Sequence, residues 1–290
     1  MQKFEMPAFY FSGTLSREQL DFFDKYGIIQ FKKFIDPSTV SLFLKETEKV
    51  QSQLLANDIK KVNGIPLKFG SDVDGSKLIQ RIAFTSFYSK ELSKFLKNEK
   101  LETLLGLMGP FEGRIGETEK DGLVFNHYVN TTKSKFTQLG WHTDSPRDLF
   151  LGSRILPMLN IGLHLDNCHS STGGLRVIPG THKQGLLSML FRKKYFIDHK
   201  ADKKEVGFDI EAGDLTIHDG RLWHRVQQSS LSGDASRRRV LYFPAITGTY
   251  LPKNETSATP FYHKLAQIKD HPLTSKLNWA RLYLKVKKTH

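Results

Sequence analysis

The half of the chain that follows residue 121 consists of short runs of β-forming residues separated by turn signals. No long helical pattern interrupts these runs, which are LVFNHYV, NIGLHL, GGLRVIPGTH, DLTIHDGRLWHRV and RRRVLYFPAI. Strands that follow one another without intervening helices pair in antiparallel fashion. The order of the runs therefore predicts an antiparallel sandwich or barrel.

The first part of the chain carries helical patterns instead. Ser16 begins the sequence SREQ, which is a capping box at the start of a helix. Asp36 precedes Pro37, as an N-cap precedes a proline at the first helical position. The segment IIQFKKF at 28–34 predicts a strand, and 89–108 predicts a third helical region. Apolar spacing near 3.6 predicts that the second helix buries Val40, Phe43, Thr47, Val50 and Leu54.

These patterns favour one domain over residues 1–290, because the helical part has a β core to pack against. We expect a mainly helical part at 1–120, a β core at 121–250 and a C-terminal extension at 251–290. Residues 185–205 interrupt the β pattern with basic and aromatic residues, so they are a candidate lid.

The stretch GWHTDSP at 140–146 places His142 and Asp144 two positions apart. On a strand, residues i and i+2 point to the same face, so an imidazole and a carboxylate are aimed at a common point. A third ligand from elsewhere would complete a metal site. The alternative is a chance pair on the surface, because isolated H-x-D triplets are common.

His224 is our candidate for the third ligand. It follows the turn at Asp219-Gly220 on a late strand, and a closed β architecture brings such a strand beside the H-x-D segment. His218 is the alternative, but its neighbour starts a turn, so we expect a core or surface position for it. Two histidines and one carboxylate leave three positions open in an octahedron, as in non-haem Fe(II) oxygenases. A tetrahedral zinc site, as in a zinc hydrolase, uses the same residue types.

The segment SRRRVLYFP places Arg238 on the same parity as Val240 and Tyr242. An arginine directed into a β core is costly unless it pairs with an anion, and a guanidinium binds a carboxylate through two parallel hydrogen bonds. Arg238 therefore suits the far carboxylate of a dicarboxylic cosubstrate. Two alternatives are a solvated cluster of all three arginines and an inward face shared by Arg237 and Arg239.

The charge of the chain bears on its partners. Forty-three basic and thirty acidic residues give a net charge of +13, which favours a small-molecule substrate that is anionic or carrier-bound. No basic segment alternates with aromatic residues, so a nucleic-acid partner is not expected. Apolar runs are shorter than a membrane span, and no secretory signal begins the chain. Cys168 is the single cysteine, which fits a reducing cytoplasm; the sequence does not indicate the oligomeric state.

Four blocks in this order resemble the phytanoyl-CoA dioxygenase family of iron(II)- and 2-oxoglutarate-dependent oxygenases. They are WHTD at 141–144, GGLRVIPGTHKQG at 173–185, GDL…HDGRLWHRV at 213–226 and RRRVL at 237–241. The N-terminal LSREQLDFFDKYGIIQFKKFIDPSTV also resembles the opening of that family.

The resemblance implies a fold and a set of roles. The fold would be a double-stranded β-helix, a cupin-like jelly roll, with the N-terminal helices packed on it. His142, Asp144 and His224 would bind Fe(II), and Arg238, or Arg239 if the register slips, would bind the distal carboxylate of 2-oxoglutarate. Asn126 would help to hold 2-oxoglutarate, while Trp141 and Arg147 would flank the substrate pocket.

The reaction that the resemblance implies consumes O2 and 2-oxoglutarate, releases succinate and CO2, and hydroxylates an unactivated C–H bond of a small molecule. Asp144 argues against a halogenating relative, in which loss of this carboxylate opens a position for halide. Two other functions stay open. They are a metal-binding jelly roll without activity and a nucleic-acid oxygenase with the same chemistry.

Overall fold

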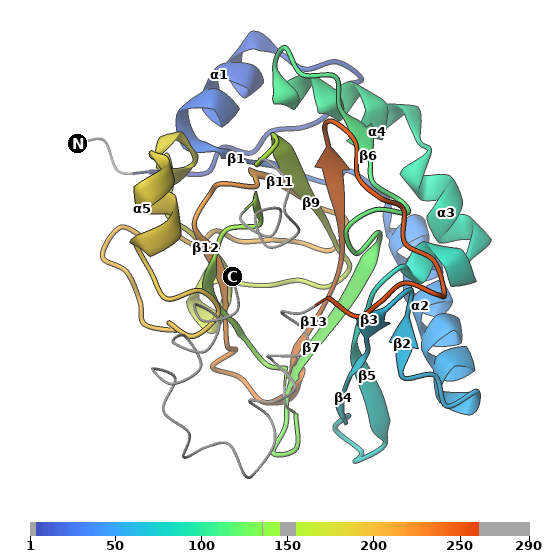
Figure 1. Cartoon of the computed structure of the whole chain (residues 1–290). Helices are drawn as coiled ribbons and strands as arrows, with labels where there is room; N and C mark the ends of the chain where they lie inside the picture. Colours follow the sequence, from blue (N-terminus) through green and yellow to red (C-terminus); the bar gives the residue numbers. More distant parts are fainter. Residues whose placement is uncertain (1–3, 135, 146–154, 261–290) are drawn as a thin grey trace, which may run out of the picture.

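A computed structural model describes residues 4–134, 136–145 and 155–260 of the chain (Figure 1). Its main feature is an eight-stranded antiparallel sheet. In order across the sheet, the strands are β1 (Ile28–Phe31), β11 (Leu215–Asp219), β9 (Met158–His164), β13 (Gly233–Ile246), β7 (Val124–Asn130), β5 (Lys77–Ile82) and β4 (Lys68–Ser71), with β6 (Arg114–Ile115) paired to β13.

A second sheet has three strands in the order β10 (Gly174–Val177), β12 (His224–Gln227) and β8 (Leu139–His142). The pair β2 (Lys61–Val62) and β3 (Ile65–Pro66) forms a separate hairpin. The predicted fold class is confirmed: the protein is mainly β, with a large antiparallel sheet and a smaller second sheet. Residues 28–34 were expected as a strand, and β1 is an integral member of the large sheet. Strands β4 and β5 also extend this sheet from the part that we expected to be mainly helical.

Alternation along β13 separates the two faces of the large sheet. Leu241 and Phe243 belong to the main apolar core, which they share with the helices, whereas Val240 packs with Tyr128 and Val226 between the two sheets. Successive strand residues point to opposite faces, so the even-numbered residues of β13 face the space between the sheets. This space holds the candidate site.

The helices begin where the sequence predicts. Helix α1 (Arg17–Tyr26) starts with the complete capping box of Ser16 and ends at Gly27, whose φ of 72° lies in the left-handed region. Helix α2 (Pro37–Ala56) is capped by Asp36, and the five predicted core residues Val40, Phe43, Thr47, Val50 and Leu54 are all buried. Figure 1 shows α2 on one side of the large sheet, beside α3 (Lys90–Leu96), and α4 (Glu99–Leu104) follows α3 in the chain.

The third helical region, expected over 89–108, consists of two short helices rather than one. The side chain of Asn98 accepts a hydrogen bond from the Lys100 amide and starts α4 as a new helix after α3. The 3₁₀ turn η1 (Thr85–Tyr88) precedes α3, and the 3₁₀ turn η2 (Leu105–Met108) follows α4 and ends the region. Asparagine is favoured at an N-cap, and this explains the break.

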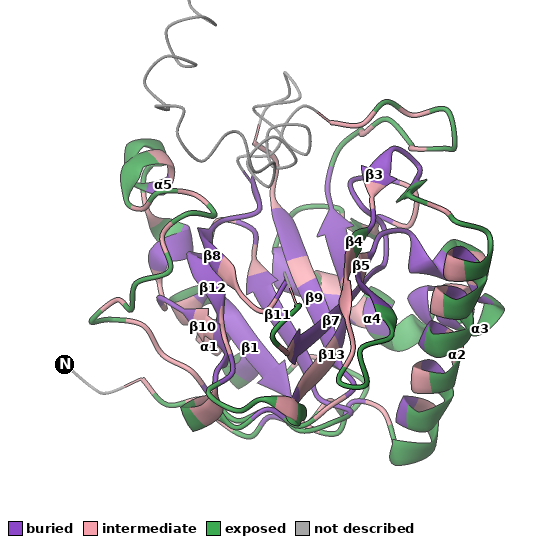
Figure 2. Ribbon diagram, turned by 90° about the horizontal axis from the view of Figure 1, so that it is seen from below, coloured by how far each residue is buried: buried purple, intermediate pink, exposed green. Residues whose placement is uncertain are grey.

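Residues 185–205, called the lid below, contain helix α5 (Leu186–Phe191) and then irregular backbone. They follow β10 after the turn η5 (Thr181–Lys183), and a further turn η4 (Ser170–Thr172) precedes β10. Figures 1 and 2 place α5 across the molecule from α2 and α3, and Figure 2 shows that α5 is largely exposed.

Hydrogen bonds connect residues 196–200 of the lid to strand β8, which carries the ligand His142. The amide of Phe196 donates to the carbonyl of Trp141 at 2.9 Å, and the Trp141 amide donates to the carbonyl of Asp198 at 2.8 Å. The Trp141 indole donates to the carbonyl of Lys200. A Cβ atom on Gly140 would lie 2.7 Å from the Phe196 carbonyl, so glycine permits this close approach.

Two sequence-based expectations extend beyond the described residues. Arg147 lies outside them, as do residues 261–290 of the expected C-terminal extension. In the part of the chain that the structure describes, no helix is both long enough and apolar enough to cross a bilayer.

Candidate metal centre

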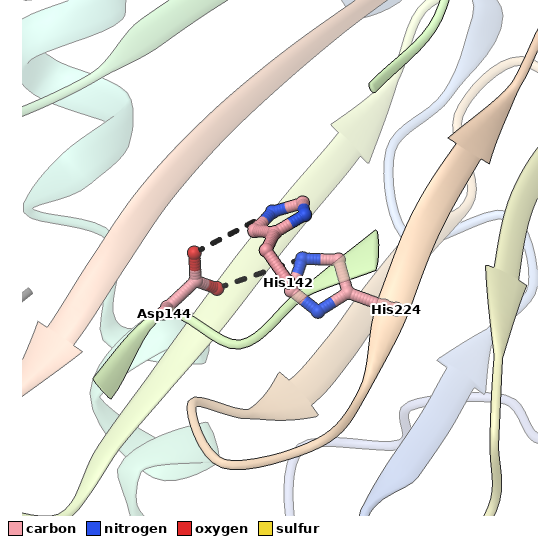
Figure 3. A group of neighbouring side chains, drawn as sticks. All are labelled: His142, Asp144 and His224. Atoms are coloured by element: carbon pink, nitrogen blue, oxygen red, sulfur yellow. Dashed lines mark ion pairs between the residues drawn. The ribbon is translucent and has the colours of Figure 1, made fainter. Parts of the chain in front are cut away.

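The structure brings His142, Asp144 and His224 together (Figure 3). Strands β8 and β12 pair in antiparallel fashion, with His142 directly opposite His224, and Asp144 follows at the end of β8. One ligand atom from each residue lies within 4.8 Å of the others, and all three side chains are buried. The cluster can hold one cation, while iron as that cation stays a prediction.

Hydrogen bonds fix the orientation of both imidazoles. His142 Nδ1 lies 2.8 Å from the carbonyl of Gly140, and His224 Nδ1 lies 3.0 Å from the carbonyl of Leu222. A carbonyl only accepts, so each Nδ1 carries the proton and each Nε2 is the atom suited to bind metal. His142 Nε2 lies 3.9 Å from Asp144 Oδ1, and His224 Nε2 lies 3.8 Å from Asp144 Oδ2.

The electrostatics of the cluster favour the protonation states that a cation requires. Burial raises the pKa of Asp144, but the imidazoles of His224, His218 and His142 outweigh it and hold that pKa well below its ordinary value. Burial also lowers the pKa of His224 well below its ordinary value, and His142 and His218 add to this effect. At neutral pH the carboxylate is therefore ionised and the His224 imidazole neutral.

Residues that the sequence reading did not assign to the site surround Asp144. The Asn160 amide donates to Asp144 Oδ2 at 2.9 Å, and the amides of Asp144 and Ser145 both donate to the carbonyl of Gly220. His218 is fully buried, as expected for a core position, but its Nε2 lies 3.4 Å from Asp144 Oδ2. Strand alternation was the available signal, because it turns Asn160 and His218 away from their core neighbours.

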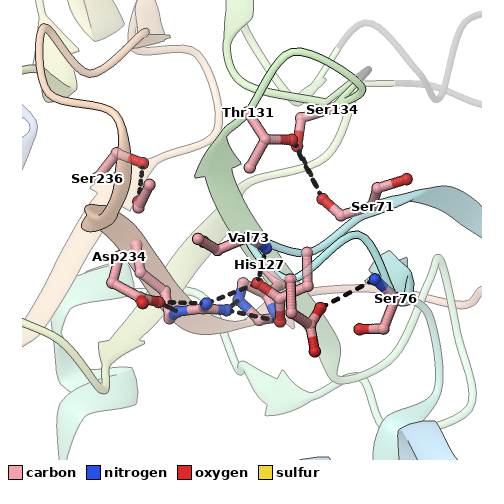
Figure 4. A network of polar contacts seen from close by, with 12 residues as sticks. Ser71, Val73, Ser76, His127, Thr131, Ser134, Asp234 and Ser236 are labelled. Atoms are coloured by element: carbon pink, nitrogen blue, oxygen red, sulfur yellow. Dashed lines mark hydrogen bonds and ion pairs between the residues drawn. The ribbon is translucent and has the colours of Figure 1, made fainter.

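The three consecutive arginines have different surroundings. Arg237 pairs with Asp72 and Asp234 and contacts His127, in a network around Asp234 and His127 that Figure 4 shows. Arg239 forms a two-pronged pair with Asp166, with both N–O distances at 2.8 Å.

Arg238 makes no ion pair with a carboxylate in the described ranges. One of its terminal nitrogens donates to the Gln227 carbonyl at 3.1 Å, and its buried Nε has no hydrogen-bond partner. Its parity places it between the sheets, as predicted. The pairs made by Arg237 and Arg239 also argue against a single solvated cluster of the three arginines.

A cavity of about 30 Å³ lies beside Arg238, between the sheets. Tyr128 lines it with its hydroxyl buried and without a hydrogen-bond partner, and the Arg238 guanidinium lies 5.6 Å from the centre of the Tyr128 ring. Asn126 occupies the same face of β7, two residues earlier, and its Oδ1 is also buried without a partner. Buried polar atoms are normally satisfied, so these atoms indicate a ligand that binds between the sheets.

Comparison of the sequence with known families identifies the family of this chain. The sequence profile of phytanoyl-CoA dioxygenase (PhyH) matches residues 23–238. The chain belongs to the phytanoyl-CoA dioxygenase family. This confirms the family that the sequence blocks predicted. A search of the curated proteins finds no match.

Solved structures with the same fold are distant in sequence from this family member. One is SnoN, a non-haem α-ketoglutarate-dependent epimerase from nogalamycin biosynthesis, with a TM-score of 0.59, 15% identity and coverage of 83% of this chain and 91% of SnoN. The carbocyclase SnoK from the same biosynthesis has a TM-score of 0.59 and 15% identity, with coverage of 90% and 94%. HygX from Streptomyces hygroscopicus, with nickel and 2-oxoglutarate bound, has a TM-score of 0.58 and 15% identity, with coverage of 82% and 89%.

At this identity the likeness establishes the fold alone. Fold, family and the buried His-Asp-His cluster agree with the predicted cofactors, iron and 2-oxoglutarate. The epimerase and the carbocyclase show that one fold serves different outcomes, so the outcome for this chain is a separate question.

Proposed function

We propose that the chain is an Fe(II)- and 2-oxoglutarate-dependent oxygenase that hydroxylates an unactivated C–H bond of a small molecule. O2 would be consumed, and succinate and CO2 released. The observation that carries the proposal is the buried cluster of His142, Asp144 and His224 on strands that face an inward arginine without a carboxylate partner among the described residues. We also propose that residues 1–290 form a single oxygenase domain; a cytoplasmic location stays a prediction.

The donor set fits Fe(II). Two neutral imidazole nitrogens and one carboxylate oxygen leave three positions open, which suffice for a chelating cosubstrate and O2. A zinc hydrolase would use the same three ligands, but it has no need of an unpaired arginine between the sheets. The arginine therefore favours the oxygenase over the hydrolase.

The groups between the sheets fit 2-oxoglutarate. Gln227, which accepts from Arg238, is three residues from His224 on β12, a separation of about 10 Å along a strand. A five-carbon dicarboxylate that chelates the metal at one end suits such a span. Arg238 and the Tyr128 hydroxyl would then bind the distal carboxylate, and Asn126 would contact the cosubstrate as a weaker partner.

Iron and 2-oxoglutarate would supply the oxidising chemistry when bound. The residues of the chain would position the metal ligands and the cosubstrate and would keep water away from the site. Hydrogen bonds to Gly140 and Leu222 hold the two imidazoles in place, and Arg238 aligns the cosubstrate by its far end. The aromatic ring of Phe196 stacks on the His142 ring at a centroid distance of 4.7 Å and limits the access of water to that ligand.

The exposed side chains of residues 185–205 support a proposal for the class of substrate. Phe196 is half exposed beside His142, and Leu187 and Phe191, four residues apart on α5, are about three-quarters exposed. Arg192 and Lys194 are exposed directly after this helix. We therefore propose a substrate with an apolar part and an anionic group, either free or carried by a larger anionic molecule.

The test is turnover with Fe(II), ascorbate and 2-oxoglutarate, measured as succinate release with and without a panel of apolar carboxylates, phosphates and thioesters. We expect substrate-dependent succinate release that requires O2 and is abolished by His224→Ala. Tight metal binding without 2-oxoglutarate affinity would instead indicate an inactive metal-binding jelly roll. Activity with Zn2+ in the absence of O2 would identify a hydrolase.

A further inference from the structure

We propose that His218 and Asn160 are positioning residues that hold one oxygen of Asp144, so that the other oxygen alone binds the metal. The proposal rests on the metal site of the proposed function. Neither residue belongs to the ligand cluster, and both come from central strands of the large sheet, opposite the small sheet that carries the two ligand histidines.

The register of the large sheet makes His218 and Asn160 neighbours. His218 on β11 lies directly opposite Asn160 on β9, so the two side chains stand on the same face. That face looks into the space between the sheets, because Leu159, Ile161 and Ile217 on the other parity belong to the main core. Two paired strands thus present two polar side chains to one carboxylate.

The contacts of this pair converge on a single atom. The Asn160 amide donates to Asp144 Oδ2 at 2.9 Å, and His218 Nε2 lies 3.4 Å from the same oxygen. Asp144 Oδ1 lies 3.9 Å from His142 Nε2, and Oδ2 lies 3.8 Å from His224 Nε2, so the two oxygens differ in their other partners rather than in their distance to the ligand histidines. Donors on Oδ2 therefore leave Oδ1 to bind the cation.

The burial of His218 is costly unless its ring has a polar partner such as Asp144. The side chain is fully buried, and neither of its ring nitrogens has a regular hydrogen bond. A buried polar group without a partner costs about 1–3 kcal/mol, so a purely structural core position would favour an apolar residue. Asp144 Oδ2 is a nearby acceptor. The 3.4 Å distance from His218 Nε2 to this oxygen becomes a regular hydrogen bond if either side chain moves by a few tenths of an ångström.

The consequence concerns the number of open positions at the metal. A carboxylate that binds through one oxygen leaves three positions, whereas a carboxylate that binds through both oxygens leaves two. The Asn160 donor on Oδ2, together with His218 once its 3.4 Å contact closes to a hydrogen bond, would oppose the second mode. The pair therefore preserves the position that a third exogenous ligand needs, in addition to supporting metal affinity.

The test measures metal affinity directly, without turnover. Co2+ is titrated anaerobically into the full-length metal-free protein, and the dissociation constant and the visible spectrum, which reports coordination number, are recorded. We expect His218→Phe and Asn160→Leu each to weaken Co2+ binding by roughly 10- to 100-fold and to change the spectrum. We expect His218→Gln, which keeps an N–H donor, to recover most of the affinity.

The matched control is His127→Phe, which replaces a buried histidine on the opposite face of the same sheet. If His218→Phe binds Co2+ with the affinity and spectrum of this control, the positioning role is wrong while the proposed function stands. If the wild-type protein binds no divalent metal, the proposed function itself is wrong. Should His218→Phe fail to fold, Asn160→Leu and His218→Gln test the same carboxylate from the two strands.

Discussion

Replacement of Arg238 by leucine tests the assignment of the cosubstrate end of the site. The guanidinium has five N–H donors, of which the structure commits one to the Gln227 carbonyl and leaves the buried Nε without a partner. At least two donors therefore remain for a carboxylate. We expect Arg238→Leu to weaken the binding of 2-oxoglutarate far more than it weakens the fold.

The size of the effect follows from these contacts. A hydrogen bond to a charged group contributes about 1.5–3 kcal/mol, so two of them contribute roughly 3–6 kcal/mol. At 1.4 kcal/mol for each factor of ten, the dissociation constant of 2-oxoglutarate rises roughly 100- to 20,000-fold. The loss of one bond to a carbonyl lowers the free energy of unfolding by only about 1 kcal/mol.

The assay is calorimetric titration of 2-oxoglutarate into protein loaded with Ni2+ under anaerobic conditions, with urea unfolding of the metal-free protein alongside. Arg239→Leu is the control. It breaks the pair with Asp166, so it lowers stability and leaves the cosubstrate affinity unchanged. Unchanged affinity in Arg238→Leu, or loss of affinity in the control instead, would refute the assignment.

Three further predictions concern other parts of the site. Tyr128→Phe removes a buried hydroxyl that has no partner within the fold, so we expect the calorimetric Kd of 2-oxoglutarate to rise about tenfold with unchanged stability; an unaltered Kd would remove Tyr128 from the site. Burial lowers the pKa of His127 to about 3 and that of His164 to about 4. The unfolded chain therefore binds protons below pH 6.5 that the folded chain does not. Urea unfolding should show a loss of roughly 2 kcal/mol from each histidine between pH 6.5 and 5, and a flat profile would contradict it. Gly140→Ala should displace the lid and speed its cleavage by trypsin, because the new Cβ would meet the Phe196 carbonyl. Gly185→Ala, with open space around its Cβ, is the control and should not change the cleavage rate. Equal cleavage of the two variants would argue against the close contact between Gly140 and Phe196.

Local chemistry was enough to predict the elements that depend on neighbours in sequence. The capping box at Ser16 and the Asp36-Pro37 start set helix boundaries, because caps satisfy backbone groups within one turn. The H-x-D spacing brought His142 and Asp144 to one point, but Asp144 lies two residues beyond the end of β8 and does not share a strand face with His142. The break at Asn98 is also local, because its side chain caps the Lys100 amide, although it was not among the predicted boundaries.

Contacts between distant segments decided the rest. Strand parity singled out Arg238 among the three adjacent arginines, but the positions of Asp72 and Asp166, far away in the chain, decide that its two neighbours are paired. The pairing of β9 with β11 likewise brought Asn160 and His218 to Asp144. Strand alternation tells which residues share a face, but the register between strands determines which of them meet, and that register forms only when the whole sheet assembles.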